Sequence, residues 1–145
     1  IDEVLELAAS LDALSEHPIA KAVVAKAKEQ GIPLKELKKF EALKGKGVKA
    51  FIEGQEVMVG GPALLESMSI EISAELSEQV QDSGKKGHTV VFVVKDKVLL
   101  GAMALADIIR EESREAIRSL KEMGITATMI TGDSEDVANW VSKEL

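Results

Sequence analysis

The sequence predicts an α+β fold in which helices flank an antiparallel sheet, followed by a partial α/β segment. Three observations support this prediction. Apolar residues recur at helical spacing near the start of the chain, and short Val-, Phe- and Ile-rich runs separated by glycines follow them. The last part of the chain then alternates helix, apolar run, glycine turn and helix. We therefore expect one complete small domain over residues 1–106 and part of a second domain over residues 107–145.

Four helices are expected in the first domain. Residues 2–14 carry a single apolar stripe at helical spacing. A second helix should begin at Pro18, because the N–H that proline lacks is unpaired at a first helical position anyway, and should end at Gly31. A short helical turn is expected to open at Pro62, and a longer helix is expected to be capped by Ser73.

The apolar runs between these helices predict an antiparallel sheet. The glycines and charged residues that separate the runs are typical of hairpin turns, with one turn expected in the stretch EGQ and another in KDK. The expected strands are about 40–43, 48–52 and 56–59, followed by two longer strands within 88–107.

The residues after 106 predict a different arrangement. The run Ile125–Ile130 shows little alternation, which is typical of a parallel strand covered on both faces. The sequence TGDS follows it, and then a final helix with Val137, Ala138 and Val141. Before this run, an amphipathic helix over 111–124 is expected to bury an apolar stripe made of Ala116, Ile117, Leu120 and Met123.

Composition argues against several classes of function. The chain has 145 residues, a net charge of −7 and no prominent basic cluster, which argues against nucleic acid as a partner. It has no cysteine and only two histidines, so a zinc or copper site within it is not expected. No apolar run approaches the roughly 20 residues of a membrane helix. The Walker phosphate loop and the dinucleotide-binding glycine pattern are both absent.

The stretch SEHP contains one of the two histidines, at the start of the second expected helix. His17 can cap this helix or lie at the surface, and it can also stack on, or hydrogen-bond to, a ligand ring. Asp12 and Glu16, which precede it, are by default solvated helix charges. The residue pattern alone leaves both interpretations open.

Two glycine pairs have the same two interpretations. Gly45 and Gly47, in GKG, can form a hairpin turn, and they can also let a flat or charged ligand approach the backbone. Gly60 and Gly61, in VGGP, can end a strand before a helix, and they can also let a ligand approach the backbone.

The stretch MITGDS combines a hydroxyl and a carboxylate at the end of an expected strand, where α/β sheets bind their ligands. The backbone of Gly132 and the helix that follows can hold a phosphate. Thr131 supplies the hydroxyl of this stretch. The structural alternative is that Asp133 or Ser134 caps the helix that follows.

The chain resembles the P-type heavy-metal-transporting ATPases in five stretches that match the family's successive landmarks. In order, they are SEHPIAKAV, GKGVKA, VGGPALL, ALADIIREESREAI and MITGDS. The resemblance covers essentially the whole chain. It implies that residues 1–106 are the nucleotide-binding domain and that residues 107–145 are part of a haloacid-dehalogenase-like phosphorylation domain. It also implies a cytoplasmic domain of a plasma-membrane pump of the copper or silver type. ATP is then the ligand, with Mg²⁺ in the full pump, and the transported ion binds elsewhere in the protein.

The resemblance assigns roles to individual residues. His17, preceded by Glu16, matches the histidine that positions the adenine, and Gly45, Gly47 and Gly60 match glycines that lie under the nucleotide. The residues that neighbour the phosphoryl site in the family are matched by Thr131, Gly132 and Asp133. The hinge between the domains is matched by Asp107 and Arg110.

Two positions depart from the family pattern. Asp12 stands where the family usually has glutamate, which shortens the side chain that reaches the adenine amine by one methylene. Gly61 stands where the family usually has asparagine, so an amide group is missing. The DKTGT motif, whose aspartate accepts the phosphoryl group, does not occur in the sequence. We therefore expect no catalytic residue in this chain, and nucleotide binding without the full reaction cycle.

Two alternative functions stay open. A soluble haloacid-dehalogenase-like phosphatase with a cap domain would need a nucleophilic aspartate in an early strand, and the first strand candidate, near Phe40, lacks one. A non-catalytic interaction module is the other alternative. Nucleotide titration separates it from the pump domain, because a plain interaction module would not respond to His17→Ala.

Overall fold

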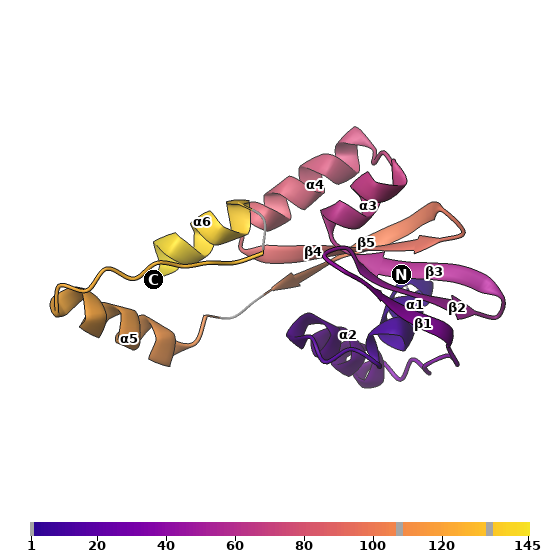
Figure 1. Cartoon of the computed structure of the whole chain (residues 1–145), viewed down its shortest axis with the longest axis horizontal. Coiled ribbons are helices and arrows are strands. Elements are labelled where there is room, and N and C mark those ends of the chain that lie inside the picture. Colours follow the sequence, from indigo (N-terminus) through magenta and orange to yellow (C-terminus); the bar gives the residue numbers. More distant parts are fainter. Residues whose placement is uncertain (1, 107–108, 133–134) are drawn as a thin grey trace. The chain divides into compact units, whose positions relative to one another are not determined.

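The computed structural model describes residues 2–106, 109–132 and 135–145 (Figure 1). They divide into two compact units, residues 1–72 with 91–103 and residues 73–90 with 104–145. The expected boundary between residues 106 and 107 stays a prediction. The elements are, in chain order, α1 (Asp2–Asp12), α2 (Pro18–Glu29), β1 (Lys38–Leu43), β2 (Gly47–Ile52), β3 (Gln55–Gly60), α3 (Pro62–Met68), α4 (Ala74–Lys85), β4 (His88–Lys95), β5 (Val98–Ala106), α5 (Glu111–Glu122) and α6 (Glu135–Glu144).

The strands of the described residues form a five-stranded sheet in the order β1-β2-β3-β4-β5. Each strand therefore lies beside its neighbour in the sequence. Short turns join β1 to β2, β2 to β3 and β4 to β5, whereas α3 and α4 connect β3 to β4. β2 and β3 pair antiparallel from Val48 opposite Val59 to Ile52 opposite Gln55. The predicted α+β class with an antiparallel sheet is confirmed, and the predicted hairpin turns lie at 53–54 and 96–97.

The core of the first unit forms around α1. This helix contacts α2, β2 and β3. Ala8 and Ala9 are completely buried in it, so their small side chains allow the helix to lie close to its neighbours. The apolar residues that complete this core include Leu5, Leu7, Leu11, Val23, Ala50, Ile52, Val57, Val59, Leu64, Phe92 and Val93.

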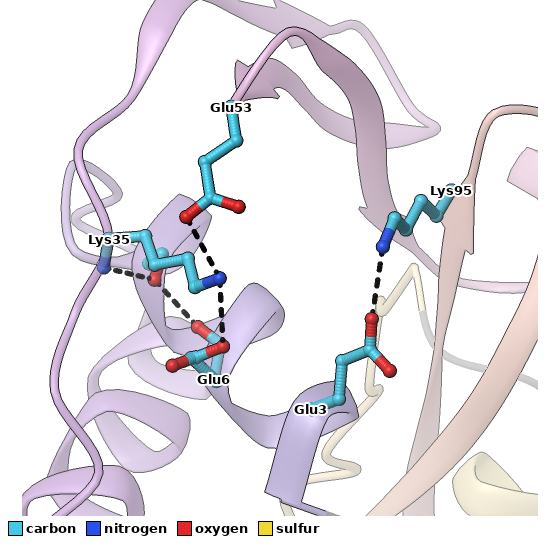
Figure 2. A network of polar contacts seen from close by, with 6 residues as sticks. Glu3, Glu6, Lys35, Glu53 and Lys95 are labelled. Atoms are coloured by element: carbon cyan, nitrogen blue, oxygen red, sulfur yellow. Dashed lines mark hydrogen bonds and ion pairs between the residues drawn. The ribbon is translucent and has the colours of Figure 1, made fainter.

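Polar contacts tie the loop after α2 and the strand ends to α1, as Figure 2 shows. Lys35 lies between Glu6, at 3.5 Å, and Glu53, at 3.1 Å, and the hydrogen bond to Glu53 raises the lysine pKa. Glu3 pairs with Lys95 of β4 at 3.0 Å. Because each of these pairs stays partly exposed to solvent, we expect them to fix positions more than they add stability.

In the second unit, α4 contacts α6. Gly87 lies against the ring of Trp140, and a Cβ at this glycine would come within 2.2 Å of the ring atom Cε3. Arg114 of α5 binds the carboxylate of Glu144 in α6 at 2.7 Å. The predicted cap of α4 is confirmed, because the hydroxyl of Ser73 accepts a hydrogen bond from the N–H of Leu76.

Two predictions for the second unit are wrong. Ile125–Ile130 does not form a strand, and Ile130 is 95% exposed. The described helix α5 has no buried residue, and Met123, which follows it, is 72% exposed. The predicted burial of Ala116, Ile117, Leu120 and Met123 therefore does not occur. The physical reason is shared. No described strand pairs with 125–130, so α5 has no sheet face to cover, and an amphipathic sequence alone cannot bury a stripe.

The turn between β1 and β2 packs closely against the end of β3. A Cβ at Gly47 would lie 2.0 Å from the carbonyl oxygen of Val59, and a Cβ at Gly60 would lie 1.9 Å from that of Lys46. Gly47 also has a φ of +127°, which L-residues rarely adopt. Two backbones therefore meet here at a separation that only glycine permits.

Replacing Gly47 with alanine should lower the free energy of unfolding by about 2–4 kcal/mol, because the new Cβ requires both a backbone shift and a strained φ. Gly61→Ala is the matched control, since a Cβ at Gly61 meets no atom within 4 Å. Urea unfolding of both variants provides the measurement. Equal losses of stability in the two variants would contradict the close backbone contact.

Candidate functional site

His17 is held in a defined orientation at the start of α2. Its Nδ1 accepts a hydrogen bond from the N–H of Ile19 at 3.3 Å, so the ring acts as the N-cap of the helix. The backbone N–H of His17 donates a hydrogen bond to the hydroxyl of Ser15 at 3.3 Å. A ring that accepts at Nδ1 leaves Nε2 for a donor N–H, so this exposed residue offers a donor and a ring face to a ligand.

The histidine is thus both a cap and a group with free binding capacity, and the two interpretations from the sequence are compatible. Sequence reasoning missed Ser15. The signal was available, because a serine two residues before a helix cap is a common side-chain-to-backbone turn.

Asp12 lies at the end of α1 and is only 7% exposed. Burial raises the pKa of its carboxyl from the ordinary 3.8 to about 6. Within the described residues, no hydrogen bond or ion pair joins this carboxylate to another side chain. Its oxygens keep some contact with solvent, so this largely buried acceptor is available to a ligand that brings its own donor.

Glu16 points into solvent. Its carboxylate forms an ion pair with Lys21 at 3.0 Å, and its side chain is 96% exposed. This placement agrees with the structural interpretation of the residue as a solvated helix charge.

The four predicted glycines fall into two kinds. Gly47 and Gly60 lie against each other, and their lack of a side chain is required by that packing. Gly45 and Gly61 have no atom within 4 Å of an added Cβ, so they border open space. The structure therefore brings the GKG and VGG stretches together and leaves backbone at Gly45 and Gly61 accessible. All four residues, with Asp12 and His17, belong to the first compact unit.

The predicted phosphoryl-site neighbours lie in the second unit. Thr131 and Gly132 are exposed, whereas Asp133 lies outside the described residues, as does Asp107 of the predicted hinge. Arg110 is the N-cap residue of α5 and makes no side-chain capping bond. Among the residues that the structure describes, no group of three His, Cys, Asp or Glu side chains could hold a metal ion. We therefore attribute no step to magnesium here.

One open hollow of about 360 Å³ occurs elsewhere in the first unit. It contains none of the predicted site residues. Carboxylates from Asp2, Glu3 and Glu6 line it, together with residues 30–33. This negative lining would repel phosphates, so the hollow is poorly suited to a nucleotide. No described helix is long and apolar enough to cross a membrane.

A family model described as haloacid dehalogenase-like hydrolase matches residues 1–145. The chain is 46% identical to the copper-exporting P-type ATPase B of Archaeoglobus fulgidus over 144 residues, which are 99% of this chain and 20% of that protein. It thus spans about a fifth of this relative.

Two solved structures are also similar. The catalytic domain of the CPx-ATPase CopB-B, studied for conformational changes upon nucleotide binding, matches 99% of this chain and 48% of its own, with a TM-score of 0.72 and 29% identity. The N-domain of HMA8, a copper-transporting P-type ATPase, matches 72% of this chain and 89% of its own, with a TM-score of 0.57 and 30% identity.

Asp12→Asn should stabilise the chain at pH 7 and have little effect at pH 4. The pKa is higher in the folded state than in the unfolded state, so the folded protein binds more protons between these pH values, and stability falls as pH rises through 6. The cost of the buried charge at pH 7 is at most about 3 kcal/mol. Urea unfolding of both proteins across pH 4–7.5 measures it. A difference that does not change with pH would contradict the buried carboxylate.

Proposed function

The chain belongs to the haloacid dehalogenase-like hydrolase family, and we propose that it binds ATP as the nucleotide-binding part of a copper-transporting P-type ATPase. The similarity to copper pumps over almost the whole chain supports this proposal. So does the likeness to an N-domain that the chain covers almost completely. In this proposal the domain lies in the cytoplasm, and the whole protein couples ATP hydrolysis to copper export.

His17 is the observation that carries the proposal. Its imidazole is oriented by the cap to Ile19, so little entropy is lost when the exposed ring face stacks on a purine. The remaining N–H on Nε2 is a donor for a ring nitrogen or a ribose oxygen.

Asp12 gives the site a preference for adenine. Its carboxylate accepts a hydrogen bond from the exocyclic amine of adenine, and this bond repays part of the cost of burial. Guanine presents an oxygen at the corresponding position, which would face the carboxylate without a proton between them. The same residue therefore favours ATP over GTP.

The glycine turn supplies the opposite wall of the proposed slot. The open space at Gly45 and Gly61 lets the nucleotide lie against backbone. This wall stays in place because Gly47 and Gly60 are packed together beneath it. No covalent step occurs in this slot, because the sequence lacks the aspartate that accepts the phosphoryl group.

His17→Asn should weaken ATP binding about tenfold, because asparagine preserves the helix cap and removes the stacking ring. Heteronuclear NMR titrations with ATP, adenosine and GTP measure the affinities. His88→Asn, at the other histidine, is the control and should bind ATP as the parent chain does. Binding of GTP as strong as that of ATP, or a His17→Asn variant with unchanged affinity, would contradict the adenine slot.

Gly61→Asn should strengthen ATP binding about fivefold, because the added amide can form one further hydrogen bond to the nucleotide. The open space at this position accommodates the side chain without strain, and asparagine also suits the N-cap of α3. Gly61→Ala is the matched control and should show no gain in isothermal titration calorimetry. If the asparagine variant also shows none, the nucleotide does not lie over Gly61.

A further inference from the structure

We propose that Lys44 and Lys46, which flank Gly45 in the turn between β1 and β2, bind the phosphates of the nucleotide. The inference rests on the proposed function and adds to it the group that recognises the charged end of ATP. The sequence has no Walker lysine and no prominent basic cluster. A sequence pattern therefore does not identify Lys44 and Lys46 as phosphate-binding residues.

The backbone of this turn is fixed on two sides. The N–H of Lys46 donates to the carbonyl of Leu43 at 2.9 Å, which closes the turn. The carbonyl of Lys46 lies against Gly60 at the end of β3, so close that a Cβ there would reach 1.9 Å from it. Both lysine residues are exposed. Their side chains therefore extend into water from a backbone that is already ordered, which lowers the entropy lost on binding.

The charges of these lysines are available. Neither Lys44 nor Lys46 forms an ion pair or side-chain hydrogen bond within the described part of the chain. Their neighbours on the same hairpin are engaged. Lys49 pairs with Glu41 at 3.0 Å, which raises its pKa, and the ammonium of Lys39 lies 5.5 Å from the centre of the Phe51 ring. The turn thus keeps positive charge in a chain whose net charge is −7.

The opposite end of β2 and β3 has a different character. Glu53 lies in the turn that joins these strands, and Asp96 lies beside it, where its carboxylate accepts from the N–H of Glu56 at 3.0 Å. Glu53 is paired with Lys35, and Asp96 is flanked in sequence by Lys95 and Lys97, so the charges at that end are largely compensated, whereas Lys44 and Lys46 have no described partner and would attract a triphosphate. This contrast gives the nucleotide a direction along the sheet, with its phosphates at Lys44 and Lys46.

Lysine binds phosphate as a point charge rather than through a rigid fork, so two exposed lysines give a modest and salt-sensitive contribution. Such a contribution acts on ATP and leaves adenosine unaffected, because adenosine carries no phosphate. This difference separates phosphate binding from adenine recognition.

The test compares the parent chain with the double variant Lys44→Gln/Lys46→Gln. Calorimetric titrations use ATP and adenosine at 50 and 300 mM NaCl. We expect ATP affinity at low salt to fall about three- to tenfold in the double variant, with adenosine affinity unchanged and the salt dependence of ATP binding reduced. Lys97→Gln is the control, since Lys97 is equally exposed but lies in the turn between β4 and β5. It should bind both ligands like the parent chain.

The outcomes distinguish the two proposals. If the parent chain binds ATP and adenosine but the double variant binds ATP equally well, the lysine turn is not a phosphate site and the proposed function survives. If Lys97→Gln weakens ATP binding as much as the double variant, only general charge is acting and the inference is wrong. If the parent chain binds neither ligand, the proposed function fails, and this inference fails with it.

Discussion

Burial of α1 is the interaction on which the rest of the first unit depends. The helix contacts α2, β2 and β3, so it joins the helical layer to the sheet. Ala8, Ala9 and Leu11 are completely buried in it, and a buried leucine alone typically contributes about 2–5 kcal/mol relative to alanine. The packing of this one helix therefore sets the separation between the start of α2, which carries His17, and the strands that carry the glycine turn.

The glycines of the candidate site divide into positions that packing requires and positions that border open space. Gly47 and Gly60 permit two backbones to meet, and any side chain there would push the turn away from β3. Gly45 and Gly61 stand beside that contact with open space around them. The close contact thus acts as the support for an accessible strip of backbone. A rigid strip of this kind binds a flat ligand without having to be ordered first.

Sequence patterns predicted the local elements well because their determinants are local. The proline and serine at helix starts and the short turns predicted α2, α4 and the hairpins within two residues. The contact between Gly47 and Gly60 was not predictable, because it joins two strands and depends on their register. Ile125–Ile130 shows the converse failure. Its apolar pattern is that of a strand, but a strand also requires a pairing partner, which local sequence does not reveal.

Asp12 shows why a residue that weakens the fold can be kept. It falls on the buried side of α1, four residues after Ala8 and seven after Leu5, so the helical period that buries those residues buries it as well. A residue chosen for packing would be apolar at this position. The packing of the neighbouring alanines and leucines is large enough to offset the cost of one buried carboxylate. The helix that positions the start of α2 therefore also offsets the cost of keeping a carboxylate without a described partner on its buried side, where the proposed nucleotide would bring a donor.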